Sequence, residues 1–384
     1  MIRETAGRIR PADKDIMEKA RQRQESLAKP PGSLGGLEEI SIRVAGMTGR
    51  VINRIERGCV AVFCADNGVA AEGVASAPQS VTMAQTVNFT RRLTGVGALA
   101  ESFGSELLIV DMGVKDPIPA ELYCSEPLED THKIVNRRIR LAKGETGNIA
   151  TGPAMTREEA EASLAAGVEM ADAIRDAGYD IMGIGEMGIG NTTTSAAVLS
   201  AVTGLTSEET VGRGGGVNDE GFRRKKEIVD FAAAEYVNRG GILKSSEDPA
   251  EDMVEALARM GGFDLCAMTG AYLGAAANRM PVVIDGYISV VAALAARVIN
   301  PDAADYMIAS HKSWEKGYSR AVEILGLKPF LALDMRLGEG SGCPVAFRII
   351  RGACDVMANM ATFSEAAIND EYLEEIRAKD SYRR

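Results

Sequence analysis

Short apolar runs alternate with helical segments along most of this chain, and this alternation constrains its fold more than any other feature. The apolar runs span 59–65, 106–112, 180–185, 281–286, 305–310 and 331–335. The helical patterns between them include 157–177, 192–203, 219–238, 250–257, 264–278 and 313–325. Strands separated by helices are typical of a mainly parallel sheet with crossover helices, so the sequence predicts an α/β fold.

Both ends of the chain are predicted to be helical instead. A polar, amphipathic helix over 12–28 is broken by Lys-Pro-Pro-Gly-Ser-Leu-Gly at 29–35, and a second helix follows at about 36–50. Residues 343–378 also have a helical pattern, with a frayed tail after them. These terminal segments predict a small helical subdomain of residues 1–50 and 343–384, beside a large α/β domain of residues 51–342.

Length and charge narrow the classes of function. The chain has 384 residues, which is enough for a sizeable buried core. It has 43 basic and 54 acidic side chains, a net charge of −11, and no long basic run, so a nucleic-acid partner is not expected. The sequence contains no run of about 18 apolar residues, so no membrane span is expected. The N-terminus lacks the apolar core of a signal peptide.

The cysteines and histidines point to a cytoplasmic protein without a metal site. None of the six cysteines forms a Cys-x-x-Cys pair, and several lie in apolar runs, as reduced core thiols do. The two histidines, His132 and His311, are far apart in the sequence. A zinc site or a histidine-based triad therefore has little to build from.

Polar residues stand at the ends of nearly all the apolar runs. They are Asp66, Asp111, Glu186, Asp285, the pair Ser310 and His311, and Asp334. The carboxyl ends of strands in an open parallel sheet share one edge, where ligands bind. Each acid alone could simply cap the next helix, but their coincidence across strands favours a site at this edge.

The densest motif is Gly-Ile-Gly-Glu-Met-Gly-Ile-Gly-Asn-Thr-Thr-Thr at 183–194, which contains G-x-G-x-x-G. A dinucleotide fingerprint needs an acid after the next strand, but 195–203 is helical and 207–209 resembles a helix start. A nicotinamide-dependent oxidoreductase is therefore not favoured. A glycine loop that opens a helix, with Asn191 and the threonines, suits a phosphate, and the alternative is an ordinary tight turn.

A second glycine loop, Gly-Arg-Gly-Gly-Gly at 212–216, precedes Lys225 and Lys226. Glycines let backbone N–H groups approach an anion, and a lysine adds a formal charge. No P-loop motif is present, so the two loops suggest a sugar phosphate rather than ATP or GTP. The alternative for the basic residues 223–226 is an exposed helix face.

A third loop, 334–342, places Glu339 between two glycines. If this loop lies in an apolar pocket, desolvation raises the pKa of the glutamate and suits it to general-base catalysis near neutral pH. The alternatives are that Glu339 caps a helix beginning near Pro344 or is simply solvated.

Nine segments, in order along the chain, resemble the nicotinate-nucleotide–dimethylbenzimidazole phosphoribosyltransferase family. They are 29–38, 65–74, 152–156, 185–193, 212–214, 285–287, 310–311, 336–340 and 360–363. The resemblance implies a Rossmann-like α/β fold with a small helical subdomain, a homodimer with sites near its interface, and no cofactor. It also implies transfer of phosphoribose from nicotinate mononucleotide to the lower-ligand base of a cobamide, giving an α-ribotide and nicotinate.

The resemblance further implies roles for individual residues. Glu339 would deprotonate the incoming base, with Glu186 nearby as an auxiliary carboxylate. The residues expected to hold the ribotide and its phosphate are Gly188, Gly190, Asn191, Thr192, Gly212, Arg213, Gly214, Lys225, Ser310 and Gly338. Those expected around the acceptor base are Asp66, Asn67, Ala77, Gln79, Gln85, Met187 and Leu337.

The chain departs from the family pattern where the acceptor should bind. Asn67 stands where the family usually has histidine, Ala77 replaces a tyrosine, and Gly215 replaces a threonine. The acceptor therefore stays open between a benzimidazole, a purine and a phenol. A non-catalytic paralogue that supports an active partner subunit in a heterodimer is the other alternative, although retention of Glu186 and Glu339 argues against it.

Overall fold

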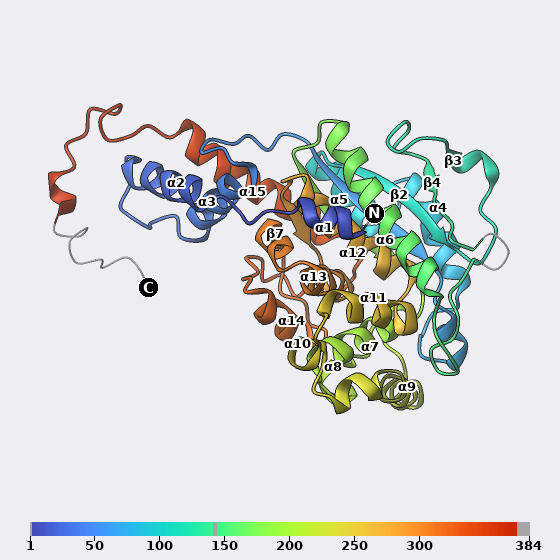
Figure 1. Ribbon diagram of the computed structural model, residues 1–384. Coiled ribbons are helices and arrows are strands. Elements are labelled where there is room, and N and C mark those ends of the chain that lie inside the picture. Colours follow the sequence, from blue (N-terminus) through green and yellow to red (C-terminus); the bar gives the residue numbers. More distant parts are fainter. Residues whose placement is uncertain (1, 141–143, 375–384) are drawn as a thin grey trace.

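The computed structural model describes residues 2–140 and 144–374 and is built around one seven-stranded sheet (Figure 1). The strands are β1 (Gly58–Ala65), β2 (Glu106–Gly113), β3 (Tyr123–Cys124), β4 (Ile134–Asn136), β5 (Ile181–Met187), β6 (Val282–Ile284) and β7 (Met307–Ala309). Their order is β3-β4-β2-β1-β5-β6-β7, and every neighbouring pair is parallel. The predicted α/β fold with a parallel sheet is confirmed.

Helices connect and cover these strands. The α-helices are α1 (Ile2–Arg8), α2 (Lys14–Ser26), α3 (Gly36–Thr48), α4 (Ser80–Thr90), α5 (Gly95–Phe103), α6 (Arg157–Asp176), α7 (Asn191–Thr203), α8 (Ser207–Thr210), α9 (Asp219–Asn238), α10 (Ile242–Ser245), α11 (Pro249–Met260), α12 (Phe263–Ala277), α13 (Tyr287–Ile299), α14 (Tyr318–Leu325) and α15 (Gly342–Asn359). The short 3-10 turns are η1 (Gly68–Glu72), η2 (Ala120–Leu122), η3 (Pro301–Tyr306) and η4 (Glu371–Leu373).

The strand order reverses between β1 and β5. The chain leaves β1 toward β2 in one direction, and it later continues from β5 to β6 and β7 in the other. Right-handed crossovers then place the connecting helices on opposite faces: α4 and α5 contact β2 on one side, and α12 and α13 contact β5 and β6 on the other. A parallel sheet binds ligands at such a reversal point, outside the carboxyl ends of its strands.

The central strands are buried on both faces. All eight residues of β1 are buried, which explains its continuous apolar run without alternation. Helix α13 was not among the predicted helices; it is also buried almost all round, as its nearly all-apolar sequence requires.

Helices α6 and α12 cross at very close range. A Cβ atom on Gly167 would lie 1.8 Å from the backbone oxygen of Ala267, and one on Gly270 would lie 1.9 Å from that of Leu164. Both glycines are therefore required by helix–helix packing.

The terminal helices α2 and α3 pack against the end of α15, and Figure 1 shows them projecting from the sheet as an arm. These three helices share a small hydrophobic core that is separate from the main one and is formed by Ala20, Ile42, Ala45 and Met357. Helix α1 instead packs against α6 and α12. The predicted division at residues 50 and 343 stays a prediction, and residues 375–384 of the predicted subdomain lie outside the described residues.

Three predicted elements are wrong. Residues 331–335 do not form a strand: only Leu331 makes a single bridge, to His311, and the chain then turns at Asp334, whose φ is 54°. The predicted helix 313–325 begins only at Tyr318, because Gly317 adopts a φ of 79°. The predicted helix 343–378 ends at Asn359, because the chain turns back to pair Thr362 with Leu27 in an antiparallel bridge.

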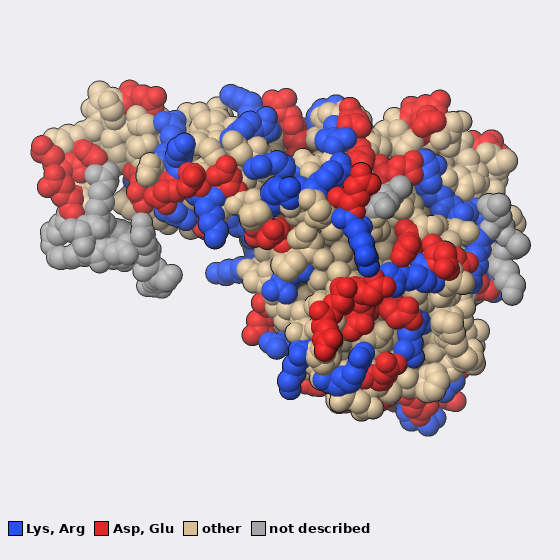
Figure 2. Space-filling model, in the orientation of Figure 1, with Lys and Arg blue, Asp and Glu red and all other residues tan. Residues whose placement is uncertain are grey.

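The visible face carries acidic and basic side chains side by side rather than one continuous basic patch (Figure 2). None of the described helices combines the length and the apolar character needed to cross a membrane.

We predict that Gly167→Ala destabilises the protein, because the added methyl group has no space between α6 and α12. Overpacking of this kind costs about 1–3 kcal/mol or more in the free energy of unfolding, measurable by urea denaturation. Gly352→Ala in α15 is the matched control, since nothing lies within 4 Å of its added Cβ and alanine favours a helix over glycine. Equal stability of the two variants would contradict the packing argument.

Candidate active site

The carboxyl ends of β5, β6 and β7 bring together four of the seven polar residues that the sequence placed at strand ends. Glu186 is the last residue but one of β5, Asp285 directly follows β6, and Ser310 and His311 follow β7. All four are buried. The predicted convergence is therefore present for these four residues only. Asp66 bonds the N–H of Lys115 after β1, Asp111 in β2 pairs with Arg138, and Asp334 accepts a hydrogen bond from Trp314.

The loop that carries Glu339 lies over these strand ends in an unusual conformation. Gly338, Glu339 and Gly340 have φ values of 88°, 63° and 87°. A non-glycine residue in this left-handed region costs about 1–2 kcal/mol. Gly185 lets the loop approach β5, because a Cβ there would lie 2.2 Å from the backbone oxygen of Glu339.

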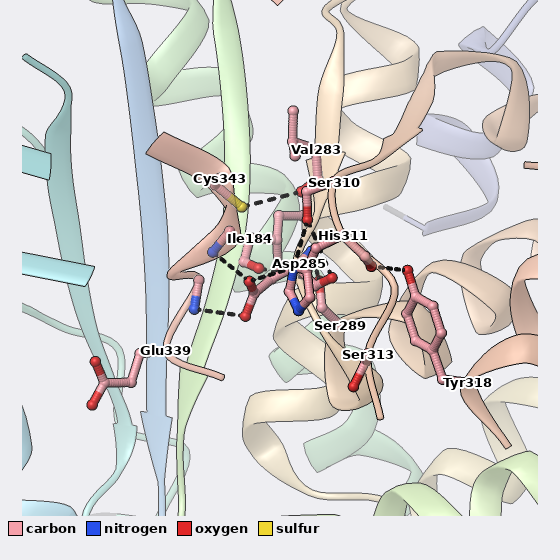
Figure 3. A network of polar contacts seen from close by, with 12 residues as sticks. Ile184, Val283, Asp285, Ser289, Ser310, His311, Ser313, Tyr318, Glu339 and Cys343 are labelled. Carbon is pink, nitrogen blue, oxygen red and sulfur yellow. Dashed lines mark hydrogen bonds and ion pairs between the residues drawn. The ribbon is translucent and has the colours of Figure 1, made fainter. Parts of the chain in front are cut away.

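Two buried carboxylates hold this loop. The backbone N–H groups of Gly340 and Gly342 donate to Asp285 Oδ2 and Oδ1, at 3.0 and 2.7 Å (Figure 3). The N–H of Glu339 donates to Glu186 Oε1 at 3.3 Å. Burial raises the pKa of Asp285 to about 7, although these two N–H groups oppose the shift.

The Glu339 side chain points away from Asp285, toward helix α5 (Figure 3). Its Oε2 accepts a hydrogen bond from the N–H of Val96 in the first turn of α5 at 3.1 Å, and its Oε1 accepts one from Gln85 Nε2 at 3.4 Å. The residue is 5% exposed, and burial raises the pKa of its carboxyl. Glu339 thus contacts the N-terminus of α5 rather than a helix near Pro344, and it is not solvated.

Glu186 belongs to a second network of buried acids. Asn191 Nδ2 donates to both Glu186 Oε2, at 2.5 Å, and Asp264 Oδ2, at 3.1 Å. Burial, with a further contribution from the neighbouring Asp264 charge, raises the pKa of Glu186 to about 8. Burial also raises the pKa of Asp264 to about 6. This network therefore favours the protonated form of Glu186.

The expected phosphate ligands divide into two groups. Lys225 Nζ donates to Thr192 Oγ1 at 2.7 Å and to the backbone oxygen of Gly212 at 3.2 Å, and a Cβ on Gly214 would lie 3.6 Å from this ammonium. Lys225 is 1% exposed and burial lowers its pKa to about 8, so it is not part of an exposed helix face.

The other expected phosphate ligands lie elsewhere. Gly188 and Gly190 pack against Asn67, and Asn191 bonds the acids described above. Arg213 points outward, where it pairs with Asp219 at 2.5 Å.

One cleft joins the Lys225 region to the acids, with about 550 Å³ of space free of protein atoms including its open mouth. Its lining includes Thr192 and Gly214 at the cationic end and Glu186, Leu337 and Gly338 at the acidic end. Other residues that line it are Gly215, Asp285, Gly286, Tyr287, Ile288, Ser289, His311, Ser313, Glu315 and Arg336.

The residues expected around the acceptor also divide. Gln85 contacts Glu339, and Leu337, which is 60% exposed, packs against Gly95 beside the same carboxylate. Met187 at the end of β5 and Ala77 are half-buried.

Asp66, Asn67 and Gln79 lie in a separate network after β1. Asp66 Oδ2 accepts from the N–H of Lys115 at 2.8 Å, and Gln79 bonds Lys115 and Glu145. Asn67 is fully buried, and its Oδ1 accepts from Thr194 Oγ1 at 3.4 Å.

Several residues of the site had no assigned role in the sequence analysis. Asp285 and His311 were visible only as strand-end residues, and Asp264 at the start of α12 carried no signal of its own. Ser313 and Glu315 were hidden by the wrong helix prediction, which placed them on a regular helix. Within residues 2–140 and 144–374, no three His, Cys, Asp or Glu side chains are grouped so that they could share a metal ion.

We predict that Glu186→Gln changes how stability depends on pH. The pKa of Glu186 is raised from 4.5 to about 8, so the folded state binds this proton more tightly, and the protein loses stability as the pH rises from about 4.5 to about 8. Each pKa unit corresponds to about 1.4 kcal/mol, so the variant should gain stability relative to the native protein across this range. Urea denaturation at several pH values measures this difference. The control is the exposed Glu121→Gln, and parallel curves for Glu186→Gln and the native protein would rule the idea out.

Comparisons with known proteins agree with this geometry. A family model described as a phosphoribosyltransferase (DBI_PRT) matches residues 9–368. The nicotinate-nucleotide–dimethylbenzimidazole phosphoribosyltransferases of Clostridium perfringens (strain ATCC 13124) and Clostridium tetani are 47% and 42% identical, covering 100% and 99% of this chain and 99% and 98% of their own. The crystal structure of CobT from Thermus thermophilus superposes with a TM-score of 0.83 at 38% identity, covering 93% of this chain and 99% of that one. The chain therefore belongs to the family of nicotinate-nucleotide–dimethylbenzimidazole phosphoribosyltransferases.

Proposed function

We propose that this protein transfers the phosphoribosyl group of nicotinate mononucleotide to an aromatic acceptor that becomes the lower-ligand base of a cobamide. The products are an α-ribotide and nicotinate. The observation that carries the proposal is a single cleft between two kinds of buried group. At one end its wall includes Thr192, which bonds the buried Lys225 behind it, and at the other end Glu186 lies in the wall and the buried Glu339 on the adjoining loop.

The cationic end suits the nucleotide phosphate. Lys225 supplies a formal charge, Thr192 a hydroxyl group, and the glycine loop at Gly214 and Gly215 supplies backbone close to the cleft. A phosphate beside Lys225 would reverse the lowering of its pKa by burial, since an opposite charge favours the ionised form.

The acidic end suits the transfer step. The bond between C1′ and the cationic ring nitrogen breaks with its electron pair going to that nitrogen, so nicotinate leaves without an acid. The acceptor nitrogen or hydroxyl attacks C1′ from the opposite face, which converts the β linkage to α, and its proton passes to Glu339. Glu186 releases its proton to water as the cationic nucleotide binds, and the resulting carboxylate stabilises the positive charge that develops on the ribose.

The environment of Glu339 supports its role as the base. Burial raises the pKa of its carboxyl, while the N–H groups of Val96 and Gly95 favour the ionised form. The opposing effects keep the carboxylate available and basic enough to accept a proton.

The acceptor occupies the side of Glu339 that faces Gln85 and Leu337, with Met187 and Ala77 completing its wall. Asp66, Asn67 and Gln79 act behind this wall by fixing the loops that follow β1. Alanine at position 77, in place of the family's tyrosine, removes an aromatic side chain from this wall, so the acceptor stays open between a benzimidazole, a purine and a phenol. A homodimer, or a heterodimer with a paralogue, stays a prediction.

We predict that the purified protein converts nicotinate mononucleotide and at least one member of a panel of benzimidazoles, purines and phenols into an α-ribotide. Chromatography with authentic α- and β-ribotides identifies the product. Glu339→Gln should lower kcat by about 100-fold or more, because general-base catalysis contributes on this scale, while Glu121→Gln should leave it unchanged. No ribotide with any acceptor would overturn the proposed function, and activity that appears only with a copurifying partner and survives Glu339→Gln would favour the non-catalytic alternative.

We also predict that Lys225→Ala raises KM for nicotinate mononucleotide by about 10- to 100-fold, because a hydrogen bond to a charged group contributes about 1.5–3 kcal/mol. KM for the acceptor should change little. Lys226→Ala is the matched control: this neighbouring side chain pairs with Glu208 on the surface. Equal effects of the two substitutions would refute a phosphate site at Lys225.

A further inference from the structure

His311 is held on one edge of its ring and open on the other. Its Nδ1 lies 3.0 Å from Ser310 Oγ and 3.8 Å from Asp285 Oδ1, and Gly342 packs against the same edge (Figure 3). A side chain on Gly342 would collide with this nitrogen. The ring orientation is therefore fixed by the residues that also hold the Glu339 loop.

The Nε2 edge faces the cleft. Among the described residues Nε2 has no hydrogen-bond partner, and it lies near Gly286, which lines the cleft together with His311 itself. The side chain is otherwise buried. A ring nitrogen that is fixed in place and aimed into a substrate cleft without a protein partner is suited to contact a ligand.

The neighbours of Nδ1 decide which nitrogen carries the proton. Ser310 Oγ can donate to the backbone oxygen of Asp285, at 3.4 Å. Nδ1–H can then donate to Ser310 Oγ, with the Asp285 carboxylate also close to this proton. This arrangement satisfies each donor, and on this ground we assign the proton to Nδ1, which leaves Nε2 as a hydrogen-bond acceptor.

Because Nε2 accepts hydrogen bonds, it can bind only a ligand group that donates one. Burial lowers the pKa of His311 to about 4, so the ring is neutral at physiological pH. A neutral acceptor cannot bind a phosphate or carboxylate oxygen, because those groups offer no proton. It fits a hydroxyl group, and the nucleotide carries hydroxyl groups on its ribose.

We propose that His311 Nε2 accepts a hydrogen bond from the 2′- or 3′-hydroxyl of the ribose, and that Ser310 and Asp285 act as positioning residues for this contact. The inference rests on the proposed function, because that function supplies the nucleotide. The contact holds the nucleotide at a third point, in addition to its phosphate and its reacting C1′ carbon. It also makes the site select ribose over deoxyribose.

Nitrogen NMR of histidine-labelled protein tests the contact directly, since the chain has only two histidines. His132→Gln assigns the signals. The unliganded protein should show a pyridine-like Nε2 for His311, and nicotinate mononucleotide should move that signal toward the pyrrole-like position while His132 stays in place. A pyrrole-like Nε2, or an Nε2 signal unmoved by saturating nucleotide, would overturn the proposal.

Substrate analogues provide the second test. With the native protein, the 2′-deoxy or the 3′-deoxy nucleotide should lower kcat/KM about tenfold, as expected for one lost hydrogen bond of about 1.4 kcal/mol. His311→Ala should lower kcat/KM for the natural nucleotide by a similar factor. With the deoxy nucleotide that lacks the bonded hydroxyl, the variant should have the same kcat/KM as the native protein. His311→Gln, which can present an amide oxygen, should recover part of the loss, and His132→Gln should behave as the native protein does.

If His311→Ala and the missing hydroxyl lowered kcat/KM independently, so that their factors multiplied for both the 2′-deoxy and the 3′-deoxy nucleotide, the contact would be contradicted. The proposed function would stay intact. A native protein that forms no ribotide would overturn the proposed function, but the NMR titration would still decide whether His311 contacts the nucleotide. Because that titration uses the native chain, misfolding of a His311 variant does not affect it.

Discussion

The buried carboxylate of Asp285 is the constraint on which the rest of the site depends. It accepts hydrogen bonds from the backbone of Gly340 and Gly342, and its Oδ1 lies 3.8 Å from His311 Nδ1. Each of these two hydrogen bonds contributes about 0.5–1.5 kcal/mol, so together they offset the cost of about 1–2 kcal/mol for one left-handed non-glycine residue. Asp285 therefore keeps Glu339 in a conformation that the loop would not adopt alone. The same carboxylate connects the proposed base to the proposed ribose contact.

The reversal of strand order between β1 and β5 explains why so many acids lie in one place. Strand ends that are distant in sequence meet at this edge, and each brings a polar residue into a region closed by buried helices. Asn191 then bridges Glu186 and Asp264 with a single amide nitrogen. Three carboxyl groups in so little solvent cannot all ionise at neutral pH, so burial raises the pKa values of Glu186, Asp264 and Asp285.

The sequence predicted the parallel sheet because strands that are buried on both faces, such as β1, have continuous apolar sequences. It predicted Glu339 and Glu186 as site residues because glycine-rich strings surround them, although their roles as catalysts stay predictions. It could not decide between an exposed and a buried Lys225, since α9 is amphipathic and the tertiary fold determines which turn is covered. The run 331–335 has strand composition but no neighbouring strand to pair with. Asp264 and His311 depend on contacts between distant segments, which no local pattern encodes.

The site contains two groups whose ionised forms are unfavourable for the same reason, burial, which moves their pKa values in opposite directions. Burial lowers the pKa of Lys225 to about 8 and raises that of Glu186 to about 8. Lys225 bonds Thr192 and the Gly212 carbonyl behind one end of the cleft, and Glu186 lies in the wall at the other end, so the two groups do not pair directly. The proposed substrate has an anionic phosphate at one end and a cationic ring at the other, and each end supplies the missing counter-charge. Binding would then ionise both residues together, which creates the charged Glu186 only when a positive ribose is there to be stabilised. A uniformly anionic ligand would satisfy the Lys225 end alone, and a neutral ligand would satisfy neither end. This difference gives the cleft a physical basis for selecting a zwitterionic nucleotide.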